Sequence, residues 1–409
     1  MRGDNNAGAV IASFKHCCPA VAGVCEHPGA YALGIAEYEP TVTSKHVTDT
    51  PKHPRPYLLL LENDLNRVYN QSLAAVAAAE LQWVTDGLLP FENRLSNIEP
   101  TSFGRAAGLL FSTSTEETAL TAIVSQLSCA LALFATSSDD KPTNSQLTPI
   151  PLPQSLVYGT ELVTTQRYRG KTNERLTRAM LNLALATAGI PLSGPWNKTP
   201  TLLDPMCGRG TTLNWALAYG CNAVGVEPDA SALKQYETFI TTWAKQQRLP
   251  HKRQTFRSNN AEKRLFTLDV APTRADQKAG TGQKVETFAA DGGDTTLHIK
   301  KQSIDVIVGD LPYGVQHRSD PAALDPPETV DLVARLAPTW RRWVRRGGAV
   351  CLAWNTRRAS RADMLVALVD SGFELPSGWD FDGVVGAEQS MAHRVDASIS
   401  RDVLLVIKP

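Results

Sequence analysis

The stretch Leu203-Asp-Pro-Met-Cys-Gly-Arg-Gly-Thr-Thr212 decides how this chain of 409 residues is expected to fold. Residues 201–204 predict a short buried strand, and residues 211–219 predict a helix. The loop between them holds Gly208 and Gly210, and a glycine lets the backbone approach a ligand where a Cβ atom would collide. The loop lacks the spacing of a Walker A phosphate loop and the third glycine of a dinucleotide fingerprint. It therefore predicts a strand–loop–helix unit that binds another kind of ligand.

Strands and helices continue to alternate after this unit. Further strands are expected at 223–227, 284–291, 303–309, 347–354 and 402–407, and further helices at 232–243, 329–344 and 361–372. This alternation predicts an α/β fold with a parallel-rich sheet that helices cover on both faces. Ligands of such sheets bind outside the carboxyl ends of the strands.

Two acidic residues stand at the ends of the next two expected strands. Glu227 lies 23 positions after Asp204, and a carboxylate at that place can accept hydrogen bonds from both hydroxyls of a ribose. Asp291, followed by Gly292, ends the third strand, where a carboxylate commonly reads an adenine amino group. A surface acid at a strand end is the alternative interpretation of each.

The segment Ile307-Val-Gly-Asp-Leu-Pro-Tyr-Gly314 carries the parts needed to methylate a planar amino nitrogen. The lone pair of such a nitrogen is delocalised into the ring and is a poor nucleophile. Two hydrogen-bond acceptors, one for each N–H group, localise the lone pair on the nitrogen. Asp310 and the carbonyl of Leu311 are the candidate acceptors, with Asp310 also the candidate proton acceptor. Pro312 rigidifies the loop, and Tyr313 can stack on the base plane. A plain turn after a buried strand is the alternative.

These motifs resemble those of a known family. Residues 204–211 resemble the S-adenosylmethionine (SAM) loop of class I methyltransferases, and more narrowly that of the putative RNA methylase family, which includes THUMP-associated tRNA guanine-N2 methyltransferases. Residues 310–314 resemble the D-[LP]-P-[YF]-G motif of that family. The expected helix with Arg175, Arg178 and Asn182 looks like its lead-in helix. The resemblance covers roughly residues 165–409.

The resemblance implies a class I Rossmann-like SAM methyltransferase with a seven-stranded, mostly parallel sheet. It places the reacting amine at Asp310 and Tyr313, and SAM is the only cofactor it implies. No metal is required, because the sulfonium of SAM supplies an activated methyl group. The candidate SAM-binding residues are Asp204, Cys207, Gly208, Gly210, Thr211, Thr212, Glu227, Asp291 and Gly292.

Basic residues before the expected SAM loop are candidates for contacts with substrate. Residues 167–178 hold five Lys and Arg against one acid, and Thr172 with Glu174 forms an imperfect helix N-cap pattern. A solvated helix face is the alternative to a phosphate-binding face. His393 and Arg394 precede the last strand and are candidates for a substrate contact. A loop ion pair with Asp396 is the alternative. The candidate substrate-binding residues are Arg167, Arg169, Lys171, Asn173, Arg175, His393 and Arg394.

The remaining chain divides by composition. Residues 1–56 are expected to be a disordered extension or the product of a start codon assigned too far upstream. Residues 57–135 predict a small α+β module with a strand at 57–61 and a second helix at 116–134, and residues 136–164 predict a linker. Residues 248–284 hold nine Lys and Arg against three acids, and a solvated loop is favoured there over a basic hairpin that touches phosphates. The module matches no THUMP pattern, so the mode of RNA capture stays open.

The composition of the chain excludes several classes of protein. The chain has 41 Lys and Arg and 41 Asp and Glu, which excludes binders that act through bulk positive charge. Its seven cysteines are too sparse for a disulfide scaffold and favour a reducing cytoplasm. The longest uncharged apolar run, residues 119–135, is short for a bilayer and predicts a buried helix, so no membrane association is expected. A monomer is the default expectation.

The expected activity is SAM-dependent methylation of an exocyclic amino group, most specifically guanine N2 in tRNA. Three alternatives stay open: methylation of DNA at adenine N6 or cytosine N4, or of rRNA; methylation of protein glutamine; and a non-catalytic RNA-binding protein with a degenerate SAM fold. Glutamine methyltransferases resembling this chain use Asn-Pro-Pro-Tyr, so Asp310 argues against that alternative. The acids Asp204, Glu227 and Asp310 argue against a degenerate site.

Overall fold

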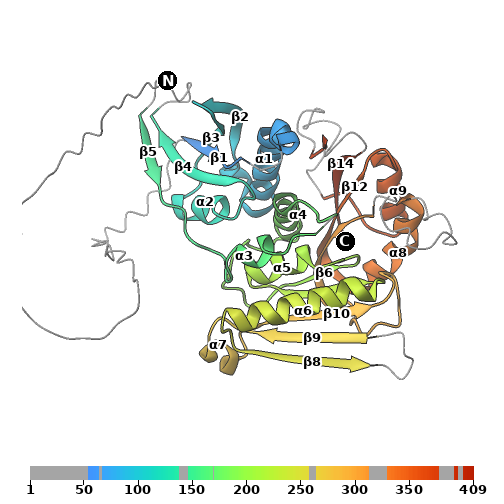
Figure 1. Cartoon of the computed structure of the whole chain (residues 1–409). Coiled ribbons are helices and arrows are strands. Elements are labelled where there is room, and N and C mark those ends of the chain that lie inside the picture. Colours follow the sequence, from blue (N-terminus) through green and yellow to red (C-terminus); the bar gives the residue numbers. More distant parts are fainter. Residues whose placement is uncertain are drawn as a thin grey trace, which may run out of the picture. The chain divides into compact units, whose positions relative to one another are not determined.

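A computed structural model describes most of the chain and shows two β-sheets with helices around them (Figure 1). The described residues are 54–63, 67–137, 146–168, 170–257, 264–312, 329–376, 391–394 and 399–409; the side chains of 67–69, 257, 264 and 394 are not described. The predictions for residues 1–53, for Arg169, for Tyr313 and for the side chain of Arg394 lie outside this set.

The larger sheet has nine strands in the order β13-β14-β12-β11-β6-β7-β10-β9-β8. Its five central strands run parallel: β6 (Thr201–Asp204), β7 (Asn222–Glu227), β10 (Gln283–Ala289), β11 (Ile304–Asp310) and β12 (Val344–Asn355). The strands beyond them are antiparallel: β14 (Ser400–Ile407) and β13 (His393–Arg394) on one side, and β9 (Arg264–Val270) and β8 (His251–Arg257) on the other. The carboxyl ends of the parallel strands therefore meet at one edge, where the ligand was expected.

The prediction of seven strands with a loop at 248–284 differs from the structure. Within this interval β8 and β9 form a hairpin that pairs with β10, and helix α7 (Arg274–Ala279) follows. Alternate residues of β9, Phe266, Leu268 and Val270, are fully buried. This period of two is what a strand with one packed face requires, so the apolar residues outweigh the basic ones in setting the local structure.

Helices cover both faces of this sheet, as expected. Helices α4 (Glu174–Thr187), α5 (Thr211–Tyr219) and α6 (Ala230–Gln246) share one core with Val306, Val308 and Cys351. Helices α8 (Thr329–Trp343) and α9 (Arg361–Asp370) share a second core with Ile307 and Val350. Successive residues of β11 and β12 thus enter opposite cores, which explains their continuous apolar sequences.

The N-terminal module has its own sheet in the order β2-β3-β1-β4-β5. Its elements are β1 (Arg55–Leu61), α1 (Arg67–Leu88), a short 3-10 helix (Phe91–Asn93), β2 (Ser96–Phe103), β3 (Ala106–Thr113), α2 (Glu117–Val124), β4 (Ala130–Thr136) and β5 (Leu147–Ile150). Strand β1 pairs antiparallel with both β3 and β4. A β-α-β-β-α-β chain with this strand order is the ferredoxin-like arrangement.

Two local predictions in this region are wrong. The helix expected at 116–134 ends at Val124, and its second half is strand β4, in which Leu131 is 55% exposed and Leu133 is buried. The interval 136–164, expected to be a linker, contains β5 and helix α3 (Glu161–Thr164). Pairing of β5 with β4 and burial of Leu162 and Val163 order these residues. Helical and strand periods are hard to distinguish in short apolar runs.

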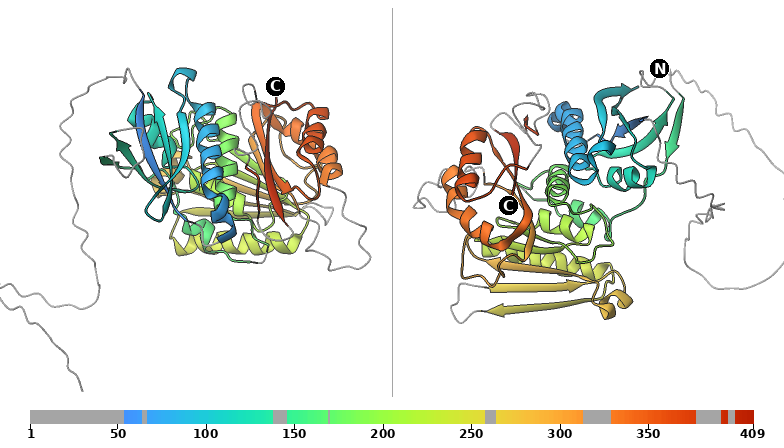
Figure 2. Two further views of the ribbon diagram at one scale, coloured as in Figure 1. Left: turned by 90° about the horizontal axis from the view of Figure 1, so that it is seen from above. Right: turned by 180° about the vertical axis from the view of Figure 1, so that it is seen from behind.

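The module and the larger domain share one continuous core. Helices α1 and α4 lie side by side (Figure 2). Their backbones approach closely, because a Cβ atom added to Gly87 of α1 would lie 2.8 Å from the carbonyl oxygen of Ala186 on α4. Among the described helices none is long and apolar enough to cross a membrane.

Candidate active site

The first strand-end carboxylate, Asp204, is almost completely buried. Its Oδ1 accepts a hydrogen bond from the backbone N–H of Met206 at 3.1 Å. Burial raises the pKa of Asp204 to about 7, against the opposing effect of hydrogen bonds from Thr212 and Met206. Asp204 and Thr212, two of the predicted SAM-binding residues, are thus in direct contact.

The loop after Asp204 is held tightly between β7 and α6. Gly210 has a φ of +82°, and a Cβ atom there would lie 2.3 Å from the ring of Tyr236. The N–H of Cys207 donates to the carbonyl of Val226 at 3.0 Å, and the N–H of Gly210 donates to the carbonyl of Cys207 at 2.7 Å. Burial raises the pKa of the Cys207 thiol well above its ordinary value, which keeps that side chain a packed neutral group.

Glu227 joins the loop to the following turn. Its Oε2 accepts a hydrogen bond from the N–H of Gly208 at 2.9 Å, and its Oε1 accepts one from the N–H of Asp229 at 3.0 Å. Gly208 has a φ of +50°, and no atom lies within 4 Å of where its Cβ atom would be. The space beside Gly208, bordered by two strand-end acids, is therefore open to a ligand.

Asp291 lies at the predicted place but has a partner that the sequence did not reveal. Its carboxylate accepts two hydrogen bonds from Arg335 of α8, at 2.9 and 3.1 Å, and one from the N–H of Gly293 at 2.9 Å. The hydrogen bonds from Arg335 lower the pKa of Asp291. A Cβ atom on Gly292 would lie 2.4 Å from the carbonyl oxygen of Pro205, so this turn packs directly on the SAM loop.

The candidate catalytic carboxylate, Asp310, ends β11 at the same edge as Asp204 and Glu227. Its Oδ2 accepts hydrogen bonds from the hydroxyl of Thr172, at 2.5 Å, and from the guanidinium of Arg401, at 3.2 Å. The N–H of Leu311 donates to the carbonyl of Ala353 on β12 at 2.8 Å, and the following Pro312 is exposed. Neither Thr172 nor Arg401 was a predicted site residue.

The basic lead-in segment makes many hydrogen bonds within the protein, including at three of the residues predicted to bind substrate, Lys171, Asn173 and Arg175. The ammonium group of Lys171 donates to the carbonyls of Val163 and Gln166, at 2.6 and 2.7 Å, and to Glu174 at 2.6 Å. An ammonium has three donors, so these bonds use all of them. Asn173, not Thr172, is the N-cap of α4, because its side chain accepts from the N–H groups of Arg175 and Leu176.

Arg175 connects the domain to the N-terminal module. Its guanidinium donates to the carbonyls of Glu62 and Asn63 and forms an ion pair with the Glu62 carboxylate at 3.0 Å. Its charge is therefore used within the protein and not for an RNA phosphate. Arg167, in contrast, is exposed. The neighbouring Tyr168 donates to or accepts from the hydroxyl of Thr211 at 3.0 Å, and Arg209 lies over its ring.

His393, a predicted substrate-binding residue, is buried near the carboxyl edge of the larger sheet. It is 4% exposed, its Nδ1 lies 2.9 Å from the carbonyl oxygen of Met391, and it is the strand partner of Arg401. Burial is the main cause that lowers its pKa, and the charge of Arg401 adds to the effect. A neutral imidazole beside the Arg401–Asp310 pair is the result.

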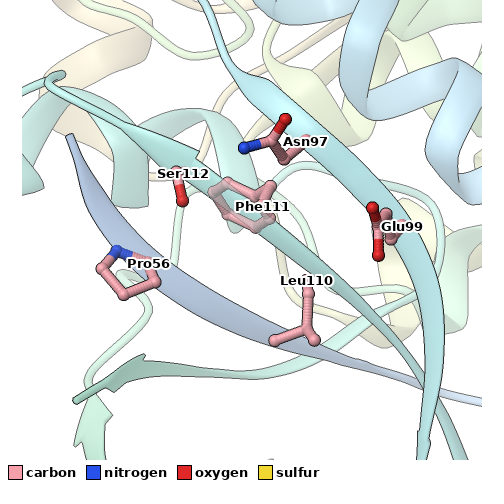
Figure 3. Close-up of a pocket in the computed structure, with 6 residues that line it drawn as sticks. All are labelled: Pro56, Asn97, Glu99, Leu110, Phe111 and Ser112. Atoms are coloured by element: carbon pink, nitrogen blue, oxygen red, sulfur yellow. The ribbon is translucent and has the colours of Figure 1, made fainter. Parts of the chain in front are cut away.

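The described residues contain no group of three His, Cys, Asp or Glu placed to hold a metal ion. A pocket lies on the N-terminal module (Figure 3). It is lined by Pro56, Asn97, Glu99, Leu110, Phe111 and Ser112, a set that holds none of the strand-end acids and no cation. The chemistry-bearing residues therefore gather at the edge of the larger sheet.

One family model matches the part of the chain that carries this site. Residues 168–362 match the family model UPF0020: RMKL-like, methyltransferase domain. No curated protein matches the chain. One similar solved structure is TrmN from Thermus thermophilus, with 13% identity and a TM-score of 0.34; the match covers 76% of this chain and 59% of TrmN. A second is a TehB-like SAM-dependent methyltransferase from Corynebacterium glutamicum, with 13% identity and a TM-score of 0.29; the match covers 55% of this chain and 92% of that protein. A third is geranyl diphosphate C-methyltransferase from Streptomyces coelicolor, with 14% identity and a TM-score of 0.30; the match covers 62% of this chain and 90% of that protein.

The family match spans the SAM loop, the strand-end acids and Asp310. The sheet around them has the parallel centre and antiparallel last strands of an α/β ligand-binding fold. Residues 168–362 therefore match the RMKL-like methyltransferase domain of UPF0020, and they form a class I, SAM-dependent methyltransferase domain.

Proposed function

We propose that this domain methylates an exocyclic amino group of a nucleic-acid base, most specifically the N2 of guanosine in tRNA. The observation that carries the proposal is the position of Asp310, followed by Leu311 and Pro312, at the carboxyl edge that it shares with Asp204 and Glu227. A carboxylate at this edge can accept an N–H of an amine while the methyl donor lies over the adjacent strands.

The residues at the edge fit SAM. Asp204, Glu227 and Asp291 stand at or just after the ends of three adjacent strands, β6, β7 and β10. They offer acceptors for the ammonium group, the ribose hydroxyls and the adenine amine of SAM, respectively, and Gly208, which is hydrogen-bonded to Glu227, has open space beside it. SAM supplies the activated methyl group when bound.

The chain's own residues orient and activate the amine. Asp310 accepts one N–H and the Leu311 carbonyl accepts the other, which frees the nitrogen lone pair from the ring. Tyr313 stacks on the base. With SAM bound, transfer of its methyl group to the amine nitrogen would break the methyl–sulfur bond and release one proton from the amine, and Asp310 would be positioned to accept that proton. Most of the catalysis assigned to the protein is positioning.

The surface charge supports an RNA that binds at the domain edge. Residues 57–135 hold three Lys and Arg against eight Asp and Glu, so the module repels a phosphate backbone. Arg357 and Arg358 follow β12 at the carboxyl edge, are exposed, and form no ion pair with a described residue. Together with Arg167 they are the proposed phosphate contacts. The described cysteines are free thiols, which supports the proposed cytoplasmic location.

The test is methyl transfer from radiolabelled SAM to total tRNA, total rRNA and duplex DNA, followed by nucleoside analysis. Asp310→Ala removes the acceptor, and Asp370→Ala, at the exposed end of α9, is the matched control. N2-methylguanosine in tRNA, absent with Asp310→Ala and retained with Asp370→Ala, supports the proposal. Label only in DNA, rRNA or protein contradicts the tRNA assignment, and SAM binding without transfer to any acceptor favours a non-catalytic RNA-binding protein.

A further inference from the structure

Asp310 and Arg401 stand on the same face of the sheet, with strand β12 between them. Asp310 pairs in register with Ala353 of β12, and Arg401 pairs with Asn355, two residues further along the same strand. Residues paired in register share a face, and residues two apart on one strand do too. This is the face that α4 covers, since Ala353 and Val308 belong to the core that contains α4.

The side chain of Arg401 reaches across β12 to the catalytic carboxylate. Its Nη2 lies 3.2 Å from Oδ2 of Asp310, and the side chains are 6% and 16% exposed. The small side chain of Ala353 leaves room for this reach. From the opposite direction, Thr172, one residue before the N-cap of α4, donates its hydroxyl to the same Oδ2. Two donors from separate elements on one oxygen fix the rotation of the carboxylate.

We propose that Arg401 and Thr172 are positioning residues that hold Asp310 in the orientation needed to accept the N–H of the substrate amine. This inference rests on the proposed function of Asp310. A charge-assisted hydrogen bond from a guanidinium and a hydrogen bond from a hydroxyl, both on Oδ2, restrict how the carboxylate can turn. The orientation of the acceptor toward the amine is thereby set before the substrate binds.

The surroundings of Arg401 are consistent with this role. His393, its strand partner on β13, is buried, and burial lowers the pKa of that imidazole. A neutral imidazole adds no second positive charge, so the charge of Arg401 is balanced by Asp310. Helix α1 of the N-terminal module lies in contact with β13, which keeps this side of the pair away from solvent. The ion pair is therefore screened less than a surface pair would be.

The experiment measures kcat and the KM for SAM and for the nucleic-acid substrate in four variants. Arg401→Gln removes the charge, Arg401→Lys retains it, Thr172→Val removes the hydroxyl, and Thr172→Ser retains it. We expect kcat to fall about 10- to 100-fold in Arg401→Gln and about 10-fold in Thr172→Val, with the KM for SAM unchanged, because misplacement of a catalytic group acts on the chemical step. Arg401→Lys and Thr172→Ser recover part or all of the loss.

Arg361→Gln is the matched control. Arg361 forms an ion pair with Asp402, the residue next to Arg401 on β14, at 2.7 Å. Thermal unfolding of every variant separates loss of fold from loss of rate. A low kcat in Arg401→Gln with normal unfolding, beside a normal kcat in Arg361→Gln, supports the inference. Normal kcat in Arg401→Gln overturns it and leaves the proposed function standing, while a wild-type chain that methylates no amine overturns both.

Discussion

The side-chain amide of Asn182 on α4 donates a 2.7 Å hydrogen bond to the carboxylate of Glu80 on α1, and neither residue is exposed. The same carboxylate accepts from the backbone N–H of Ser128 at 3.0 Å and from its hydroxyl at 2.5 Å. The amide of Asn182 also donates to the carbonyl of Gln126, and its oxygen accepts from Tyr219. A connected polar network of this kind, buried in an otherwise apolar core, favours one relative placement of the module and α4.

This network bears on the proposed catalytic site because α4 begins next to Asp310. Its N-cap, Asn173, follows Thr172, whose hydroxyl donates to Asp310, the proposed catalytic carboxylate. Arg175, the second residue of α4, forms an ion pair with Glu62 of the module. The N-terminal module thus supports the start of α4, a role that does not require it to bind RNA and that fits its excess of acidic residues.

The first prediction concerns the stability that Glu80 provides. Glu80→Ala leaves the N–H and hydroxyl of Ser128 and the amide of Asn182 without their acceptor inside the core. We expect the free energy of unfolding to fall by about 3–5 kcal/mol, the range for breaking a buried charged contact. Urea unfolding measures it. Glu92→Ala, on an exposed turn of the same module, should change stability by less than about 0.5 kcal/mol. If both substitutions lowered the free energy of unfolding by the same small amount, the buried network would not contribute to stability.

Local sequence signals predicted the parts of the site that depend on local structure. Asp204, Glu227 and Asp310 each end a strand, as expected, because a buried apolar run followed by an acid and a turn is readable in a few residues. The left-handed conformation of Gly210 follows in the same way from its place in a tight turn.

The partners of these residues could not be predicted. Arg401 is 91 positions from Asp310, and Thr172 is 138 positions from it. Nothing in the local pattern distinguishes them from other Arg and Thr residues. Lys171 and Arg175 show the reverse problem, since a basic segment near the expected SAM site suggests phosphate binding. In the structure, Lys171 donates to carbonyls and an acid a few residues away, and Arg175 pairs with Glu62 of the N-terminal module. Only strand order and helix packing decide which charges remain available.

The second prediction tests the close approach of the SAM loop to α6. Gly210→Ala places a Cβ atom 2.3 Å from the ring of buried Tyr236, besides the strain of its left-handed backbone. We expect it to abolish SAM binding and to lower stability by more than about 2 kcal/mol. Gly280→Ala is the control, because Gly280 has a similar φ of +70° and no atom within 4 Å of the added Cβ. Calorimetric titration with SAM and thermal unfolding compare them, and similar losses in both variants would refute the steric explanation.

The third prediction uses the raised pKa of Asp204. Burial raises this pKa from 3.8 to about 7, so between these values the folded chain holds a proton that the unfolded chain releases. The folded state binds more protons, and stability from this group therefore falls as the pH rises toward 7. Asp204→Asn cannot titrate, so the stability of the wild type without SAM should fall relative to that variant by about 1.4 kcal/mol per pH unit across pH 5–7. Urea unfolding at several pH values tests this.

A control separates Asp204 from the other titrating groups. Asp370→Asn changes an exposed carboxylate at the end of α9, and its stability should follow the wild type at every pH. Parallel curves for the wild type and Asp204→Asn would mean that Asp204 is ionised in the folded chain.

The last prediction tests where RNA binds. Arg357 and Arg358 are exposed at the carboxyl edge of the larger sheet, and the double substitution to Ala removes two proposed phosphate contacts. We expect weaker binding of tRNA and a plot of log affinity against log salt that is less steep by about one unit per arginine, with SAM binding unchanged. Arg274→Ala with Lys278→Ala removes the same charge from α7, which precedes β10 and so lies at the opposite edge. Filter binding across a potassium chloride series distinguishes the pairs. Equal losses of slope would indicate a nonspecific effect of net charge, whereas a loss confined to Arg357 and Arg358 places the RNA beside Asp310, where the amine must arrive.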